Sequence, residues 1–372
     1  MNGKMIGVLA IVTLIMGVVA SQISQAPTSP QIQSNQLLYP QLLPVLKEVD
    51  EIQIKTKTSE VSLLKKSEQW GVKEKAQYPA MFDKIADVLN GMANLQLVEA
   101  KTDKAELYNK LDVEDISNEG AKSVQVVLKK NNDIVADLII GKARPAKGDS
   151  LRSELYVRKA NDKQSWVVLG NVNVGRQIHD WLDKQIAHIE ENRVREVVIN
   201  QATPIRIFRE KSDDKDFQLA NLPEKATTEQ TNIKNIARFL AHLSLEDVMA
   251  ANEFKGGENP FTAVFTTFDG LEMTVTFQTL DNKHYATLSA VAKPDLVTGE
   301  KREELLEKLQ KEVEQLNQRL SNWVYIIPEH KVRALLQKPD ALFKIPTEET
   351  PNSTVSKEKS NALETLENLG KH

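Results

Sequence analysis

The fold is decided by EIQIKTKTSEVSLL at residues 51–64, a stretch that occurs in a second, similar form as EVVINQATPIRIF at residues 196–208. In both, two short runs alternate apolar and polar side chains, and this period of two puts the apolar side chains on one face of a β-strand. Each stretch therefore predicts a half-buried hairpin. Trp70 and an amphipathic helix at 78–92 follow the first hairpin, whereas Phe217 and a helix at 231–243 follow the second.

Later elements return in the same order. Strand-like runs at 124–128 and 134–140, joined by Asn131-Asn132-Asp133, have counterparts at 261–268 and 271–277, joined by Asp269-Gly270. Asp-Gly between alternating runs is among the stronger hairpin signals. We also expect helices at 101–111, at 174–189 and around 332–336, and a hairpin loop at 141–150. The pattern predicts an α+β fold of two tandem repeated modules, residues 37–190 and 191–345, each of antiparallel strands with covering helices.

The N-terminus predicts a membrane segment at residues 1–23. After Lys4 the run 5–20 carries no charge, and Thr13 has its only polar side chain. A spanning helix needs about 20 apolar residues, and the hydrophobic part of a signal peptide has about 7 to 15. We therefore expect a transmembrane anchor, with a cleaved signal segment as the alternative. Residues 24–36 predict a polar tether and residues 346–372 a disordered tail.

Residues 300–321 form a charged helix with no counterpart in the first module. Its apolar side chains recur three and four positions apart, as in a short coiled coil, and they are Leu306, Leu309, Val313, Leu316 and Leu320. Two interpretations remain open. The apolar stripe either packs on its own domain or docks a partner or a second copy of the chain. In the second case these five residues are the candidate interaction surface.

Composition and motifs exclude several functions. The 372 residues are 41% hydrophobic, and 48 basic against 52 acidic residues give a net charge of −4. We therefore expect no nucleic-acid partner, because there is no broad positive field. Cysteine is absent, and the six histidines show no metal-ligand spacing. No Walker, GxSxG or dinucleotide motif occurs.

Adjacent carboxylates are the remaining catalytic candidates. The pairs Glu114-Asp115 and Asp213-Asp214 are interpreted as solvated charge, because neighbouring residues on a turn point in different directions. We expect no enzyme activity, no cofactor and no metal.

Several segments of the first module resemble a known family. They are Tyr78-Pro79-Ala80, Val98 to Thr102, Tyr108 to Asp115, Asp137 to Gly141, Leu155 to Arg158 and Trp181-Leu182-Asp183. In these segments the chain resembles the bacterial domain-of-unknown-function family 4340. Where that family usually has glycine in a Leu-Gly-Val-Glu-Asp turn, this chain has Asp112, so we expect a less left-handed turn here.

The resemblance implies a membrane-anchored protein that faces the cell envelope, sometimes encoded beside components of a gliding-type or related ABC transport system. With Lys4 on the cytoplasmic side, the expected location is the bacterial inner membrane, with a single pass and the bulk of the chain in the periplasm. The expected function is a non-enzymatic accessory or scaffold subunit with protein partners in the envelope. A periplasmic ligand-binding module is the alternative, and an enzyme with an unrecognised site is third. Any binding role is expected where the copies differ, at 141–150, at 300–321 and at the junction of the modules.

Overall fold

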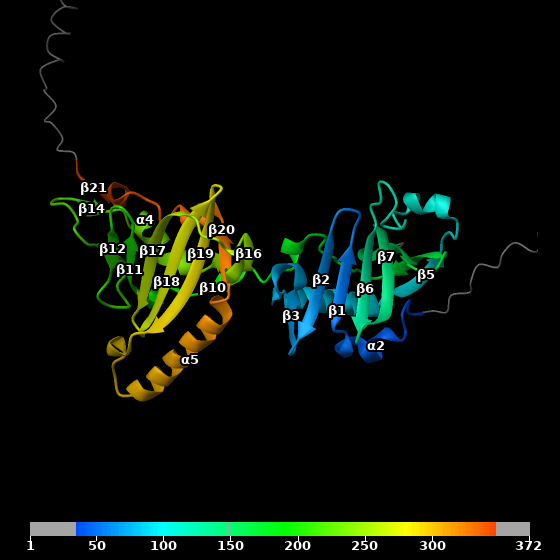
Figure 1. The fold of residues 1–372 in the computed structure, drawn as a ribbon, viewed down its shortest axis with the longest axis horizontal. Helices are drawn as coiled ribbons and strands as arrows, with labels where there is room; N and C mark the ends of the chain where they lie inside the picture. The colour runs from blue at the N-terminus through cyan, green and yellow to red at the C-terminus, as the bar shows by residue number, and fades with distance from the viewer. Residues whose placement is uncertain (1–34, 147–148, 347–372) are drawn as a thin grey trace, which may run out of the picture. The chain divides into compact units, whose positions relative to one another are not determined.

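The computed structural model describes residues 35–146 and 149–346 of the chain. The expected anchor at 1–23, the tether as far as residue 34 and the tail from residue 347 lie outside the described residues. Within the described ranges, no helix is both long and apolar enough to cross a membrane. The chain divides into two compact units between Lys184 and Gln185 (Figure 1). The predicted boundary fell after Glu190, but strand β10 (Gln185–Ala187) pairs with β15 (Leu243–Ser244) and so belongs to the second unit.

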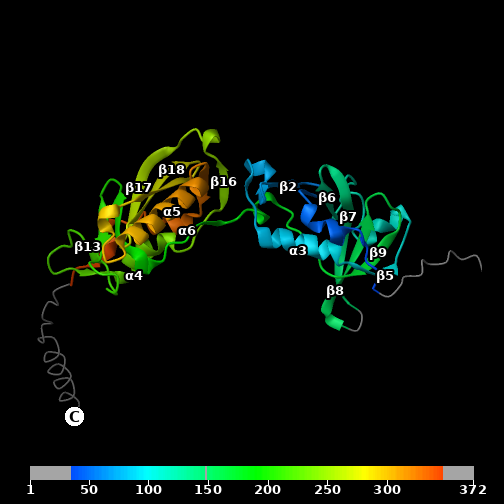
Figure 2. The same ribbon diagram turned by 90° about the horizontal axis from the view of Figure 1, so that it is seen from below.

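The first unit is built on one nine-stranded antiparallel sheet in the order β4-β3-β2-β1-β6-β7-β8-β9-β5. The predicted hairpin is present as β1 and β2, in which Ile52 pairs with Leu63 and Ile54 with Val61. Helix α3 buries Ile85, Val88 and Met92 (Figure 2). The elements are α2 (Leu42–Val45), β1 (Glu51–Lys55), β2 (Glu60–Lys66), β3 (Gln69–Val72), β4 (Tyr78–Pro79), α3 (Phe82–Ala93), β5 (Gln96–Ala100), β6 (Val124–Lys130), β7 (Asp133–Ala146), β8 (Asp149–Lys159) and β9 (Ser165–Leu169).

The second unit has an eight-stranded antiparallel sheet in the order β13-β12-β11-β17-β18-β19-β20-β16. The predicted Asp269-Gly270 turn joins β17 to β18, and Gly270 adopts the left-handed conformation, with φ +87°. The elements are β11 (Val194–Asn200), β12 (Ile205–Phe208), β13 (Gln218–Leu219), β14 (Thr227–Thr228), α4 (Gln230–Ala237), β16 (Asp247–Ala250), β17 (Glu258–Thr267), β18 (Leu271–Leu280), β19 (Lys283–Ala292), α5 (Arg302–Leu320), β20 (Trp323–Ile327), α6 (Glu329–Val332) and β21 (Phe343–Lys344).

The two sheets have the same strand order when they are followed from β3 and from β13. In the first unit the β1–β2 hairpin lies beside the β6–β7 hairpin, and in the second the β11–β12 hairpin lies beside the β17–β18 hairpin. In both units the strand that comes just before the central hairpin in the sequence lies at the far edge of the sheet. That far-edge strand is β5 next to β9 in the first unit and β16 next to β20 in the second. The first unit adds β4 at the opposite edge.

Several expected helices are shorter than the sequence indicated. The helix expected at 78–92 begins only at Phe82, because Tyr78 and Pro79 pair with β3. Short 3-10 segments at Ala105–Lys110 and Ile178–Asp180 replace the helices expected at 101–111 and 174–189. The helix expected at 231–243 is α4 with a following 3-10 turn that ends at Leu240, and in place of the helix expected around 332–336 there is the short α6, which ends at Val332. The loop expected at 141–150 is mainly strand, since β7 extends to Ala146.

Helix α5 packs its apolar stripe on β19 of its own unit (Figures 1 and 2). Leu309 and Leu320 are buried, while Leu306, Val313 and Leu316 are half-buried. Asn317 fixes the helix position, because its side chain exchanges two hydrogen bonds with the main chain of Ala290, at 2.9 and 2.8 Å. Leu309 and Leu320 therefore pack within their own domain, and docking of a partner by the half-buried residues of the stripe stays a prediction.

We expect Leu309→Ala to lower the free energy of unfolding of the second unit by about 2 to 3 kcal/mol, as for other buried leucines. The side chain is 4% exposed and fits against Gly270 of the β17–β18 turn. Leu305→Ala is the matched control on the same helix, since Leu305 is 42% exposed and should cost less than about 1 kcal/mol. Urea unfolding followed by circular dichroism measures both. Equal costs would contradict the packing of α5 described above.

Candidate functional site

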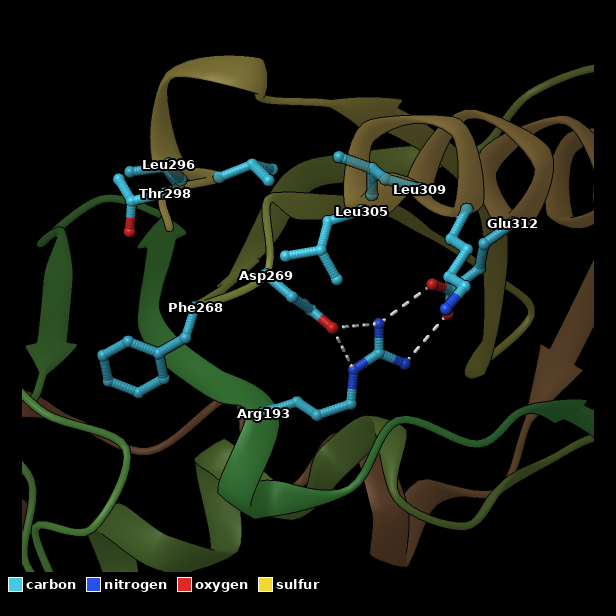
Figure 3. Close-up of a pocket in the computed structure, with 10 residues that line it drawn as sticks. Arg193, Phe268, Asp269, Leu296, Thr298, Leu305, Leu309 and Glu312 are labelled. Carbon is cyan, nitrogen blue, oxygen red and sulfur yellow. Dashed lines mark hydrogen bonds and ion pairs between the residues drawn. The ribbon is translucent and has the colours of Figure 1, made fainter. Parts of the chain in front are cut away.

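The second unit contains a pocket of about 570 Å³ beside the N-terminal half of α5 (Figure 3). Its walls are mainly apolar and include Leu296, Val297, Leu305 and Leu309. Figure 3 shows Arg193 at its lower edge, reaching toward α5. Because α5 has no counterpart in the first unit, this pocket lies where the two units differ.

The charged residues around this pocket are paired with one another. Arg193 donates to both carboxylate oxygens of Glu312, at 2.9 and 3.0 Å, and its Nε donates to Asp269, at 2.9 Å (Figure 3). Burial alone would lower the pKa of the Arg193 guanidinium, but Glu312 and Asp269 outweigh it and raise that pKa. Lys308 pairs with Glu304. Arg193 thus connects Glu312 of α5 to Asp269 of the β17–β18 turn and stabilises the helix position, whereas the Lys308–Glu304 pair lies within α5.

The segments that carry the family resemblance meet at two places in the first unit. At the first, Tyr78-Pro79-Ala80 lies against Trp181-Leu182-Asp183 through a bridge between Ala80 and Leu182. The Tyr78 hydroxyl donates to the Asp183 carbonyl at 3.0 Å, and the Trp181 indole donates to the Gly175 carbonyl at 3.0 Å. These groups are buried and hydrogen-bonded, so this place joins the end of the unit to its beginning.

At the second place, the connection between β5 and β6, residues 101–123, is bound to the sheet. Tyr108 and Val113 of the connection form a buried cluster with Ile139 of β7. The main chain of Lys142 donates to the carbonyl of Leu111 at 3.0 Å. This close approach requires glycine at the preceding position, because a Cβ on Gly141 would lie 2.2 Å from the same carbonyl oxygen.

Arg158 of β8 attaches the connection to the sheet through hydrogen bonds. The residue is 3% exposed, and its Nε donates to the Val113 carbonyl at 3.0 Å. Its other nitrogens donate to the carbonyls of Ala160 and Asp162 and to the Asp115 carboxylate, the last at 2.5 Å. The guanidinium lies 4.6 Å from the centre of the Tyr108 ring. A single buried cation thus fixes both sides of the turn at 111–115.

The turn itself is left-handed at Asp112, with φ +56°. The expectation that Asp in place of Gly makes the turn less left-handed is therefore wrong. Aspartate tolerates this conformation better than most residues. The neighbouring backbone also requires it, since Val113 donates to the Tyr108 carbonyl at 3.1 Å and Leu111 is held by β7.

Asp112 and Glu114 of this turn line an acidic pocket of about 450 Å³, which we take as the candidate functional site. Four carboxylates, two amides and one lysine line it, namely Glu106, Asp112, Glu114, Glu119, Asn109, Asn118 and Lys122. Glu114 is 7% exposed, and its Oε1 accepts from the main chain of Lys122 at 2.8 Å. Among the described residues, nothing hydrogen-bonds its Oε2.

This geometry corrects the interpretation of Glu114-Asp115 as solvated charge. The two side chains do point in different directions, as expected for neighbours on a turn. Asp115 is exposed and pairs with Arg158, but Glu114 is buried and lines the pocket. In the described part of the chain, no group of three His, Cys, Asp or Glu side chains could hold a metal ion. The pocket therefore presents hydrogen-bond acceptors and negative charge without converging metal ligands.

Sequence reasoning did not single out this pocket. Binding was expected at 141–150, at 300–321 and at the junction of the modules, where the copies were expected to differ. A further difference is between the connection at 101–123 and its equivalent between β16 and β17, which spans only 251–257. Aligning the two copies by their strands would have shown this insertion, which contains the Tyr108 to Asp115 segment of the resemblance.

A buried phenol in the first unit predicts alkaline loss of stability. Tyr39 is 4% exposed, and its hydroxyl donates to the Asp137 carbonyl at 2.7 Å. Burial raises the pKa of Tyr39 above its usual value near 10. The unfolded chain then releases this proton first as the pH rises, so the stability is complete below about pH 10 and decreases above it, by at most about 1.4 kcal/mol per pH unit.

Urea unfolding at pH 8 to 11 measures this effect. We expect Tyr39→Phe to be less stable than the wild type at pH 8 and to lose less stability at higher pH. Tyr285→Phe, a change in the second unit, is the control and should leave the alkaline loss of the first unit unchanged. The same slope in Tyr39→Phe and wild type would show that another group causes the loss.

The fold and the acidic pocket define a two-unit α+β protein in which the resemblance segments fix one long connection to the first sheet. A family model described as a domain of unknown function, DUF4340, matches residues 70–260, just over half of the chain. The chain therefore belongs to the DUF4340 family. No curated protein and no solved structure matches it.

Proposed function

We propose that the protein is a non-enzymatic, single-pass protein of the bacterial inner membrane, with its two units in the periplasm. There it acts as an accessory or scaffold subunit of an ABC-type transport or other envelope complex. The uncharged run at 5–20 after Lys4 and the polar residues at 24–36 support export and anchoring. The common strand order of the sheets supports an origin by internal duplication, which would give the protein two related units to contact partners.

The outer face of α5 is the observation that carries the scaffold role. The helix has 19 residues and is therefore about 28 Å long. Its apolar side is used on β19, and its opposite side is a continuous exposed stripe of Glu303, Glu307, Lys311, Glu314 and Gln318. A rigid charged stripe of this kind suits electrostatically complementary docking, which selects partners and speeds association. Helix α5 is present only in the second unit, since the first unit has no helix between the equivalent strands β8 and β9.

Crosslinking in intact cells tests the scaffold role. A photo-reactive amino acid at Lys311, on the exposed stripe, should capture a permease or ATPase subunit of an ABC system. The same amino acid at Asp281, an exposed position on the β18–β19 turn, is the matched control. Capture of no transport or envelope subunit from Lys311 would count against the proposal, and so would the same products from both positions.

Protease treatment of spheroplasts tests the location separately. Both units should be digested while a cytoplasmic marker is preserved, and the N-terminal segment should remain with the membrane. Full protection of the units would overturn the proposed orientation. Release of the intact units into the periplasm would favour the cleaved signal segment.

A periplasmic ligand-binding module is the second candidate. The observation in its favour is the acidic pocket with the buried Glu114, because binding sites combine a concave shape with a few placed polar groups.

A further inference from the structure

We propose that the acidic pocket of the first unit binds an organic cation through a guanidinium or primary ammonium group, with Glu114 as the central acceptor. This goes beyond the scaffold role, since it concerns a different unit from α5 and does not depend on where the protein resides. The cationic group could belong to a lysine or arginine side chain of a protein partner or to a free polyamine. Both sources present the same chemistry to the pocket.

The first step of the argument is the unsatisfied oxygen of Glu114. One carboxylate oxygen accepts a main-chain hydrogen bond, and the other has no partner among the described residues although the side chain is 7% exposed. Buried polar groups in folded proteins are nearly always hydrogen-bonded, because desolvation without a partner is costly. A donor from outside the chain would satisfy this oxygen.

The second step is the charge of the lining. Glu106, Asp112 and Glu119 join Glu114 around the pocket, against Lys122 alone. Lys142 lies 3.6 Å from Asp112 and offsets part of this charge from the outside. Like charges in one cavity repel each other, and a bound cation relieves the repulsion while forming charge-assisted hydrogen bonds. The missing donor is therefore expected to be positively charged.

The third step distinguishes an organic cation from a metal ion. A metal ion needs several ligands that converge on one point, and no three candidate side chains in the described ranges do so. The pocket has a volume of about 450 Å³, which suits a side chain better than a bare ion. A guanidinium carries five donors and an ammonium three, so either can reach separated carboxylates and the amide oxygens of Asn109 and Asn118.

The fourth step is the rigidity of the support. Glu114 follows Val113, whose carbonyl accepts from the buried Arg158, and precedes Asp115, whose carboxylate pairs with it. The Glu114 carbonyl accepts from the buried hydroxyl of Ser123 at 2.6 Å. A binding group is effective when its neighbours fix its position before the ligand arrives. Three of the resemblance segments, Tyr108 to Asp115, Asp137 to Gly141 and Leu155 to Arg158, therefore meet at the support of this carboxylate.

Titration calorimetry on the full chain in detergent micelles, at low ionic strength, tests the proposal. The probes are spermidine, acetyl-Gly-Arg-Gly-amide, acetyl-Gly-Glu-Gly-amide and calcium chloride. We expect spermidine, the arginine peptide or both to bind, and neither the glutamate peptide nor calcium. Binding of the peptide assigns a protein side chain as the occupant, and binding of spermidine alone assigns a free amine.

Glu114→Gln keeps the shape and the hydrogen bond from Lys122 but removes the charge, so it should weaken binding by at least about 10-fold. Glu74→Gln is the matched control, because Glu74 also accepts a main-chain hydrogen bond, from Ser62 at 2.9 Å, but lies outside the pocket. It should bind as the wild type does. If Glu114→Gln lacks the native circular dichroism spectrum, the double variant Glu106→Gln with Glu119→Gln replaces it, since both side chains are exposed.

Three results would overturn the proposal. One is that the wild type binds neither cationic probe. Another is that the variant of the pocket binds them as tightly as the wild type. The third is that calcium alone binds. None of these bears on crosslinking from α5, so failure here is separable from failure of the scaffold role.

Discussion

Gly141→Ala is expected to lower the free energy of unfolding of the first unit by about 3 kcal/mol, the sum of overpacking and a weakened main-chain hydrogen bond. The added Cβ would lie 2.2 Å from the Leu111 carbonyl oxygen and 2.8 Å from that of Asp112. Both atoms are backbone, so no side-chain rotation relieves the contact. The turn could only move away from β7, which would break the hydrogen bond from Lys142 to Leu111.

Urea unfolding followed by tryptophan fluorescence measures this loss, because Trp70, Trp166 and Trp181 lie in the first unit and only Trp323 in the second. Lys142→Ala is the control at the next position. Its side chain is 49% exposed and pairs with Asp112 at 3.6 Å, so its loss should cost less than about 1 kcal/mol. The main-chain hydrogen bond remains in that variant. A Gly141→Ala protein as stable as Lys142→Ala would show that the turn is not held against β7.

Gly141→Ala should also affect the acidic pocket, because Asp112 and Glu114 follow Leu111 in the same turn. In the protein that remains folded, the turn must shift outward, and the binding of cationic probes should weaken. The binding measurement therefore shows whether the turn supports the pocket or only stabilises the fold. Unchanged binding with reduced stability would favour the second view.

The strands could be predicted from the sequence because alternation is a local property. Ile52 and Ile54 face the core because of their spacing alone, and Asp269-Gly270 specifies its turn within two residues. The mixed α+β architecture built on antiparallel sheets was predicted in this way. The helices were less predictable. The apolar spacing of Ile178, Trp181 and Leu182 fits a helix face, but these residues form a turn and a bridge to Ala80, a contact about 100 residues away along the chain.

The pocket could not be predicted because its decisive feature is a long-range one. Glu114 and Asp115 are alike in sequence, and only the contacts with Gly141 and Arg158 determine which one is buried. Asp112 was expected to relax the turn, yet the same contacts hold it left-handed. The stripe on α5 shows the complementary limit. Its spacing correctly indicated one apolar face, but the spacing is the same for a face that packs on β19 and for one that docks a partner.

Arg158→Met is expected to lower the free energy of unfolding of the first unit by about 3 to 5 kcal/mol. Methionine fills a similar volume but donates no hydrogen bond. The carbonyls of Val113, Ala160 and Asp162 then lose a donor, and the turn at 111–115 loses its attachment to β8. An unsatisfied buried acceptor costs about 1 to 3 kcal/mol, so the buried Val113 carbonyl and the two partly buried ones together leave a large deficit.

Arg206→Met is the matched control for this change. Arg206 also pairs with one carboxylate, Glu196, and also lies 4.6 Å from the centre of an aromatic ring, that of Phe208. Its side chain is 52% exposed, so water replaces what the methionine removes, and the cost should stay below about 1 kcal/mol. Asp115→Asn separates the contributions further: since Asp115 is 58% exposed, it should cost far less than Arg158→Met. If Asp115→Asn costs as much as Arg158→Met, then the ion pair and not the carbonyl hydrogen bonds holds the connection, and the support of Glu114 would depend on ionic strength.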